Sequence, residues 1–204
     1  MKLFLATGNT HKLAELSSIL QASGVSIKVM PPSAVGGMPE VEEDARTFEG
    51  NARKKAKALA AVLRERGESS AWAVADDSGL CVDALDGAPG VHSARYAGPG
   101  ATDGANLAKL LRALAGVAEP QRTAAFHCCL VAAAPDGRAS AFEGRCPGRI
   151  IDDPRGASGF GYDPVFVPDG FEETFSELSN EVKNTISHRA RALAGFIDWL
   201  RTAP

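Results

Sequence analysis

The start of the chain constrains its fold most, because the sequence pattern changes from strand to helix within a few residues. Lys2–Ala6 is a short apolar run typical of a buried strand, and the small polar turn Thr7–Thr10 follows it. Apolar residues at helical spacing come next and run up to Gly24: Leu13, Leu16, Ile19 and Leu20. Strand, tight turn and helix in this order indicate an α/β protein.

The middle of the chain continues this alternation. The spacing predicts a helix over Thr47–Arg66, with Gly67 after its end. Its expected inner face consists of apolar residues: Phe48, Ala52, Ala56, Leu59 and Leu63. The apolar strand Ala71–Ala75 is expected to end in Asp76-Asp77-Ser78-Gly79, before Leu80–Val82 returns as another strand.

Further elements follow in the second half of the chain. Asp103 could cap a helix, and a last helix is expected over Ser187–Leu200. Between them, Thr123–Ala134 and Arg138–Ile150 are typical of a hairpin around Pro135-Asp136-Gly137. Helices that alternate with strands, followed by a hairpin, predict an α/β fold with a mixed sheet.

The composition excludes several classes of protein. Of 204 residues, 45% are hydrophobic, which is enough for a sizeable core. The formal net charge of -3 argues against a protein built mainly to bind nucleic acid. The sequence shows neither a signal peptide nor a membrane span, and its cysteines lack zinc spacing, so we expect a cytoplasmic protein without a membrane partner.

The turn Thr7–Lys12 could bind an anion. Between a strand and a helix, free backbone N–H groups and the positive end of the helix dipole favour a phosphate. Gly8 lets a ligand approach the backbone, Thr7 and Asn9 can donate hydrogen bonds, and Lys12 adds a positive charge. The Walker A pattern is missing, and these residues taken alone fit an ordinary capped helix better.

Acidic residues at two places could hold a metal ion. Asp76 and Asp77 follow a strand that is expected to be buried, where two adjacent charges need a partner. Neighbours on a strand point to opposite faces, so only one of the two should face a site. Carboxylate oxygens suit Mg²⁺. An acid within Glu40–Asp44 could complete the site, although most charges of this loop and of the helix after it are expected to be solvated.

Two later segments could hold a nucleotide base. Gly159–Pro164 places aromatic rings among glycines, which suits a loop around a flat ligand and equally a turn anchored in the core. Lys183, His188 and Arg189 could donate hydrogen bonds to a base carbonyl or could be structural. A phosphate turn, metal-binding acids, a stacking ring and hydrogen-bond donors are together the parts of a metal–nucleotide site.

Seven segments resemble the signatures of the inosine/xanthosine triphosphate pyrophosphatase family. In chain order they are ATGNTHKLAEL, TFEGNARKKA, ADDSGLCVDAL, GAPGVHSARYAG, FGYDPVF, FSELSNEVKN and ISHRARAL. The resemblance implies a single domain over residues 1–204, with an elongated mixed β-sheet flanked by helices in two lobes and a nucleotide cleft between them. It also implies a homodimer that uses Mg²⁺ to hydrolyse ITP, dITP and XTP to the monophosphate and pyrophosphate, which removes them from the nucleotide pool.

The resemblance also implies a role for each matching position. Asp77 would be the catalytic carboxylate and would hold Mg²⁺ together with Glu43, with Glu42 as a rival because the preceding loop varies in length. Lys55 would contact the phosphates and Ser78 the substrate. The phosphate-binding turn would be Thr7, Gly8, Asn9, Thr10, His11 and Lys12. The base pocket would be Phe160, Gly161, Tyr162 and Asp163, with Phe160 stacking, and the base edge would be read by Lys183, His188 and Arg189.

Other functions stay open at this stage. A pyrophosphatase of similar fold could act on pyrimidine or methylated nucleotides. A module that senses nucleotides without hydrolysis could use the same turn and aromatic loop, although the paired Asp76-Asp77 disfavours a pure binder of phosphates. A nucleic-acid-binding protein fits the acidic balance of the chain poorly.

Overall fold

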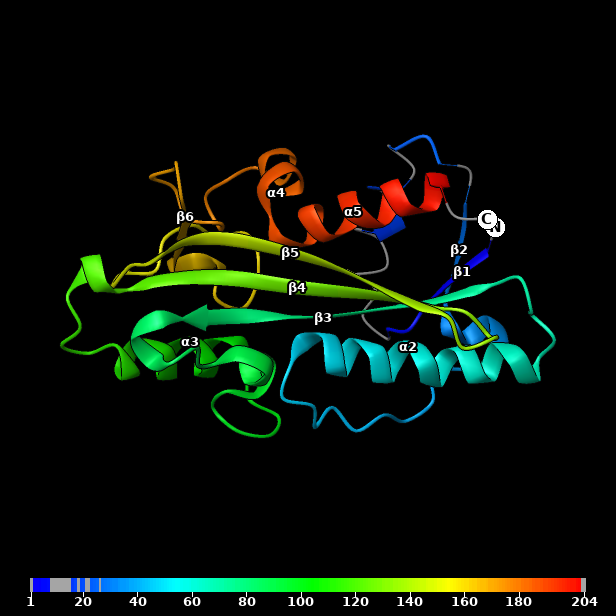
Figure 1. Cartoon of the computed structure of the whole chain (residues 1–204). Helices are drawn as coiled ribbons and strands as arrows, with labels where there is room; N and C mark the ends of the chain where they lie inside the picture. Colours follow the sequence, from blue (N-terminus) through cyan, green and yellow to red (C-terminus); the bar gives the residue numbers. More distant parts are fainter. Residues whose placement is uncertain (1, 8–15, 18, 21–22, 26, 203–204) are drawn as a thin grey trace. The chain divides into compact units, whose positions relative to one another are not determined.

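We describe a computed structural model of the chain over residues 2–7, 16–17, 19–20, 23–25 and 27–202. Within these ranges, six strands form a sheet in the order β2-β1-β3-β4-β5-β6 (Figure 1). The strands are β1 Lys2–Leu5, β2 Lys28–Met30, β3 Trp72–Val82, β4 Thr123–Ala133, β5 Ala139–Ile150 and β6 Phe166–Pro168. Strand β1 pairs in parallel with β2 and β3, whereas β5 and β6 are antiparallel. The predicted mixed sheet is confirmed.

Helices accompany these strands. They are α2 Phe48–Glu65, α3 Asp103–Ala113, α4 Asn180–Ile186 and α5 His188–Thr202. Helix α2 begins where predicted because the Thr47 side chain accepts a hydrogen bond from the Gly50 N–H, and it is followed by Gly67 with a φ of 74°. The sequence did not predict α4 or β6.

By its contacts the chain divides into two compact units. Unit 1 comprises Met1–Asp77, Cys129–Glu143 and Ala192–Pro204, and unit 2 comprises Ser78–Cys128 and Gly144–Arg191. Strands β3, β4 and β5 each contribute residues to both units. The nucleotide cleft between two lobes stays a prediction.

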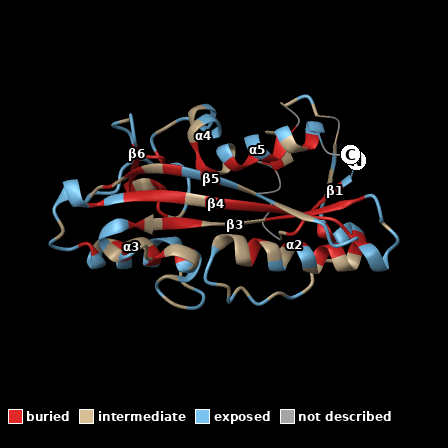
Figure 2. Cartoon of the chain, viewed as in Figure 1, coloured by how far each residue is buried: buried red, intermediate tan, exposed pale blue. Residues whose placement is uncertain are grey.

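The core of unit 1 lies on both faces of its strands. Ala52, Ala56 and Leu59 of α2 pack with Ala73 and Ala75 of β3, because the apolar residues of α2 recur at helical spacing and those of β3 alternate. On the other face, the rings of Trp72 and Trp199 lie 4.7 Å apart, which places α5 there. Figure 2 shows β4 buried along nearly its whole length, whereas β5 alternates between buried and more exposed positions.

Unit 2 has its own core of aromatic and aliphatic side chains. The Phe126 ring lies 4.7 Å from Phe166 and 5.8 Å from Phe175. Leu110 and Leu114, in and directly after α3, pack against the same cluster. Tyr162, from the loop of the predicted base pocket, belongs to the same cluster and ties that loop to the core.

Two sequence predictions about element ends are wrong. The strand does not end at Asp76, because β3 continues without a break through Asp76-Asp77-Ser78-Gly79 to Val82. Lys55 of α2 pairs with the Asp77 carboxylate, so the strand can carry this charge in its middle. The cap of α3 is Thr102, whose side chain accepts from the Ala105 N–H, and Asp103 lies in the first turn instead.

Candidate functional site

Asp77 faces α2 because of its register in β3. Ala71, Ala73 and Ala75 pack in the core cluster that contains the inner face of α2. Side chains two apart on a strand share a face, so Asp77 continues this row and Asp76 points the opposite way. The Asp77 side chain is 13% exposed, which leaves it accessible at the edge of an apolar interface. Of the two adjacent acids, Asp77 is therefore the one presented to the lysines of α2.

Lys55 lies between two carboxylates. Its Nζ is 2.9 Å from Glu43 Oε2 and 3.6 Å from Asp77 Oδ1, and its side chain is 13% exposed. Burial disfavours the charged ammonium, but the Asp77 carboxylate and the hydrogen bond to Glu43 outweigh burial and raise the pKa of Lys55. The structure thus brings three predicted site residues together in unit 1: Glu43, Lys55 and Asp77.

Asn51 joins this group, and the sequence analysis missed it. Its Nδ2 donates a hydrogen bond to Asp77 Oδ2 over 3.0 Å, and the residue is 1% exposed. The sequence does carry a signal for Asn51. It is a polar residue one turn before Lys55, and it lies on the face of α2 that was expected to be apolar.

Two further charge pairs form among residues of the acidic loop and α2 at the surface. Lys54 pairs with Asp44, and Arg53 pairs with Glu49 one turn away. The Lys54 ammonium also approaches the backbone carbonyl of Glu42 at 3.4 Å. It is the carboxylate of Glu43 that reaches Lys55, which favours Glu43 over Glu42 as the second acid.

The predicted stacking ring protrudes from a constrained turn in unit 2. Phe160 is 56% exposed, and the Arg189 guanidinium carbon lies 5.3 Å from its ring centroid. The Phe160 N–H donates to Asp163 Oδ2 over 3.2 Å, and Gly159 has a φ of 82°. A Cβ at Gly159 would lie 2.4 Å from Asp163 Oδ2, so only glycine fits there.

Asp163 and Lys183 form a pair below this turn. Lys183 Nζ lies 2.8 Å from Asp163 Oδ2, with side-chain exposures of 17% and 8%. The Gly161 N–H donates to Asp103 Oδ2 over 2.8 Å, so the residue expected to cap α3 instead fixes the turn. Two predicted base-site residues, Asp163 and Lys183, are therefore engaged with each other.

Tyr162 and His188 are held by the core. The Tyr162 hydroxyl donates to the Ser93 carbonyl over 2.8 Å, and burial raises the pKa of this phenol. The His188 ring stacks on Phe126 with centroids 4.9 Å apart. Next to it, Arg189 donates to Ser78 Oγ over 3.2 Å. Ser78, Phe160 and Arg189 thus form a connected group in unit 2.

Of the predicted phosphate-binding turn, the structure describes the first residue, Thr7. Gly8, Asn9, Thr10, His11 and Lys12 lie outside the described residues. The Thr7 N–H, at the start of this turn, donates to the Leu5 carbonyl over 2.8 Å. The phosphate-binding role of the turn stays a prediction.

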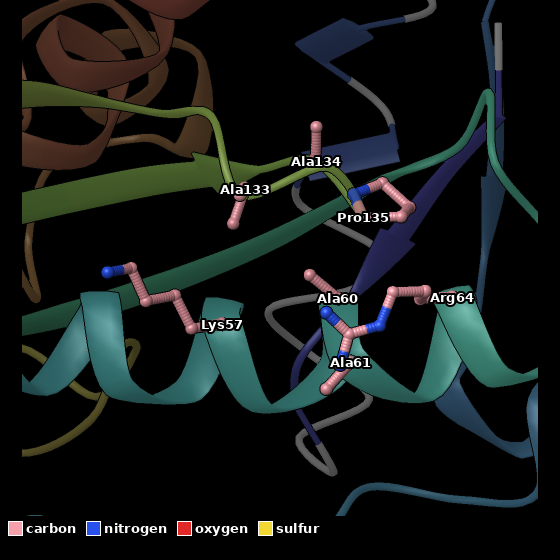
Figure 3. Close-up of a pocket in the computed structure, with 8 residues that line it drawn as sticks. Lys57, Ala60, Ala61, Arg64, Ala133, Ala134 and Pro135 are labelled. Atoms are coloured by element: carbon pink, nitrogen blue, oxygen red, sulfur yellow. The ribbon is translucent and has the colours of Figure 1, made fainter.

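A hollow beside α2 is separate from these groups. Figure 3 shows it between α2, which carries Lys57 and Arg64, and the turn between β4 and β5, which carries Ala134 and Pro135. Its lining contains no predicted site residue: Lys57, Ala60, Ala61, Arg64, Ala133, Ala134, Pro135 and Gly137. We therefore do not assign it to the predicted site.

The fold and the first group of residues define a class of protein. A half-buried lysine beside two carboxylates, on a mixed α/β sheet, offers the cation and the oxygen donors that enzymes acting on phosphorylated substrates use. Among the helices in the described ranges, none is long and apolar enough to cross a membrane.

The chain belongs to the Ham1 family, whose profile matches residues 3–199. It is 53% identical over 205 residues to the dITP/XTP pyrophosphatase of Opitutus terrae, covering 98% of this chain and 99% of that relative. It is 50% identical over 203 residues to the dITP/XTP pyrophosphatase of Desulforamulus reducens, covering 98% and 96%. The resemblance seen in the sequence is confirmed.

Solved structures agree with this family. The fold matches a HAM1 protein from Coxiella burnetii with a TM-score of 0.89 and 38% identity, covering 100% of both chains. It matches the Ham1 protein of Staphylococcus aureus with a TM-score of 0.88 and 36% identity, again over 100% of both chains. The predicted enzyme class is the one that the names of the relatives state.

Proposed function

We propose that the chain hydrolyses deaminated purine nucleoside triphosphates, namely dITP, ITP and XTP, to the monophosphate and pyrophosphate. The observation that carries the proposal is the Lys55 ammonium held between the Glu43 and Asp77 carboxylates. The names of the relatives, dITP/XTP pyrophosphatase, support the substrate class. Removal of such nucleotides from the pool would be the role of the enzyme.

The residues of unit 1 fit the phosphate chemistry. Asp77 orients a water molecule and accepts its proton as the water oxygen bonds to the α-phosphorus. The bond between that phosphorus and the oxygen bridging to the β-phosphate breaks, and pyrophosphate leaves with the electron pair. Lys55 donates hydrogen bonds to phosphate oxygens as negative charge grows on them.

The same carboxylates suit a magnesium ion. Glu43 and Asp77 offer only oxygen donors, both reach one ammonium, and their side chains are 37% and 13% exposed. Mg²⁺ binds through one or two carboxylates and keeps several waters, so a larger cluster of ligands is not needed. When bound, the ion would neutralise phosphate charge and lower the pKa of water.

The residues of unit 2 fit recognition of the base. Phe160 offers an exposed ring for stacking, and the Arg189 guanidinium beside it offers donors. Hypoxanthine and xanthine carry a carbonyl at position 6 that accepts such hydrogen bonds, whereas adenine carries an amino group. A buried donor left facing that amino group costs about 1–3 kcal/mol. Adenine nucleotides are therefore expected to react slowly.

The experiment that tests the proposal is pyrophosphate release by the purified protein from ITP, XTP, dGTP, ATP and dTTP, with Mg²⁺ and with EDTA. Metal-dependent release confined to ITP and XTP supports the proposal. Orthophosphate release or equal use of all five nucleotides would overturn it, and preference for dTTP would indicate the pyrimidine alternative. Binding without turnover would indicate a sensing module.

The assembly is also a proposal. We infer a homodimer from the family resemblance. Sedimentation of the purified protein at several concentrations measures it, since a mass of twice 21.3 kDa is expected. A monomer at all concentrations would contradict this inference without affecting the proposed reaction.

A further inference from the structure

We propose that Asn51 is a positioning residue that sets the orientation of the Asp77 carboxylate. The inference rests on the proposed function, because it assumes that Asp77 acts on the substrate. Asn51 is 1% exposed and lies in the second turn of α2, on the face that packs against β3. An asparagine in such a place must have both polar atoms satisfied, since a buried unpaired amide is costly.

Both polar atoms of Asn51 have partners. The Ala45 N–H donates to Asn51 Oδ1 over 2.9 Å, and Asn51 Nδ2 donates to Asp77 Oδ2 over 3.0 Å. The two partners fix the amide orientation, because an N–H requires the oxygen and a carboxylate requires the nitrogen. Asn51 thus connects the acidic loop to Asp77.

Asn51 and Lys55 act on the two oxygens of the same carboxylate. They stand one turn apart on α2 and share a face. Asn51 bonds Oδ2 of Asp77, while the Lys55 ammonium lies 3.6 Å from Oδ1. A carboxylate held at both oxygens cannot rotate about its χ2 angle without losing a contact, so its orientation is fixed before a substrate binds.

The same two residues also hold the acidic loop. Asn51 accepts from the Ala45 N–H, and Lys55 bonds the Glu43 carboxylate, two positions earlier in the loop. Asn51 and Lys55 of α2 therefore link the loop of Glu43 to Asp77 and set the position of one carboxylate relative to the other. This arrangement gives Asn51 a role at the reacting group that burial alone would not require.

Two substitutions distinguish the contacts of Asn51. Aspartate has the same shape and can still accept from the Ala45 N–H, but it turns an acceptor toward the Asp77 carboxylate. Alanine removes both hydrogen bonds. Asn51→Asp therefore separates the contact with Asp77 from the contact with the loop, and Asn51→Ala tests both together.

The chain contains a matched control. Asn106 in α3 is 2% exposed, accepts from the Ala97 N–H at 2.7 Å and donates to the Ala94 carbonyl at 3.2 Å. It makes the same kind of connection as Asn51, but to backbone groups only. Asn106→Ala should lower thermal stability to a similar degree as Asn51→Ala and leave kcat of the folded enzyme within about threefold of wild type.

The test is steady-state hydrolysis of dITP by the full chain and its variants, together with melting temperatures. For Asn51→Ala we expect kcat to fall roughly 10- to 100-fold, with KM within about threefold, because Asn51 orients the reacting carboxylate. Asn51→Asp should lose at least as much kcat. Wild-type kcat in Asn51→Asp would overturn the proposal and leave Asn51 as a tether of the loop.

A double-mutant cycle completes the test and separates this inference from the proposed function. If Asn51 acts through Asp77, Asn51→Ala should add no further loss to the residual rate of Asp77→Asn. A multiplied loss would overturn the inference while leaving Asp77 catalytic. Full activity of Asp77→Asn would instead overturn the proposed role of Asp77, whatever the Asn51 variants do.

Discussion

At the scale of single residues, the described parts of the site depend on how charges are placed in a mostly apolar interface. Asp77 lies in register with the alanines of β3 that pack on α2, so it meets the inner face of that helix. Lys55 stands on the same face and compensates the charge. A carboxylate in the middle of a core strand is tolerated because its counter-charge comes from the helix packed on it.

Replacement of Lys55 by methionine should impair both stability and turnover. Lys55→Met keeps the apolar stem but leaves Glu43 and Asp77 without the shared ammonium, so the free energy of unfolding should fall by about 1–3 kcal/mol. The rate of dITP hydrolysis should fall by at least about tenfold. Urea unfolding and pyrophosphate release measure the two effects.

Lys57→Met is the control for this variant. Lys57 lies on the same helix and lines the hollow beside α2. It forms no ion pair with any residue that the structure describes. We expect wild-type stability and turnover from it. Equal losses in both variants would mean that any lysine of α2 matters only through the net charge of the helix.

The two aromatic residues around the base site should behave in opposite ways. Phe160 is 56% exposed, so Phe160→Ala should leave the melting temperature unchanged and raise KM for dITP by about tenfold through lost stacking. Phe175 is 1% exposed, so Phe175→Ala should lower stability by about 3–5 kcal/mol. An unchanged KM in Phe160→Ala would contradict the predicted stacking.

At the scale of elements, the sequence predicted the helices and strands with a strong apolar period. It failed where contacts with another element determine how far a strand extends. Helix α2 and the hairpin of β4 and β5 follow the expected ranges closely, because their apolar periodicity is strong. The break predicted in β3 is wrong, because Asn51 and Lys55 come from another element to satisfy Asp77. Local pattern could not reveal a counter-charge supplied from α2.

The sequence predicted some residues of the site and missed another, because contacts between elements do not show in the sequence. The family motifs pointed to Lys55 and Asp77, the resemblance favoured Glu43 over Glu42 in the variable loop before α2, and the structure brings Glu43, Lys55 and Asp77 together. Asn51 was missed because an asparagine within a helix usually has no special role. Its function depends on the packing distance between α2 and β3, which sequence spacing does not contain.

The start of α2 gives a prediction at this scale. Thr47 caps the helix that carries Asn51 and Lys55, and its side chain accepts from the Gly50 N–H over 3.0 Å. Thr47→Ala should lower the free energy of unfolding by about 1 kcal/mol, whereas Thr47→Ser should keep the cap and nearly all of the stability. Chemical unfolding measures the difference, and equal stabilities of the two variants would contradict the capping role.

At the scale of the whole molecule, each unit has a buried thiol in its interior. Cys129 belongs to the core of unit 1 and Cys146 to that of unit 2, and both are 2% exposed. Burial raises the pKa of Cys129 to about 12 and that of Cys146 to about 11, from an ordinary value of 9.0. Both thiols therefore stay protonated in the folded protein when they would ionise in the unfolded chain.

Alkaline pH should consequently destabilise the protein through both units. A raised pKa in the folded state contributes stability that is fully present below the unfolded pKa and is lost as pH rises toward the folded pKa. Here the loss begins near the ordinary value of 9.0 and continues to about 11 for Cys146 and about 12 for Cys129. Between about pH 8 and about pH 10, the raised pKa of each thiol should lower the free energy of unfolding by roughly 1 kcal/mol.

Urea unfolding of the wild type, Cys129→Ala and Cys146→Ala at these two pH values measures the effect. Each variant starts from a lower stability, because the smaller side chain leaves a cavity, but it should lose less on going to the higher pH. The compared quantity is the change in the free energy of unfolding between the two pH values. The cavity affects both pH values equally, and the lysines and tyrosines titrate in all three proteins, so neither contributes to the difference between wild type and variant. Identical changes would mean that the thiols ionise equally in the folded and unfolded chains, and hence that the two cores admit water at alkaline pH.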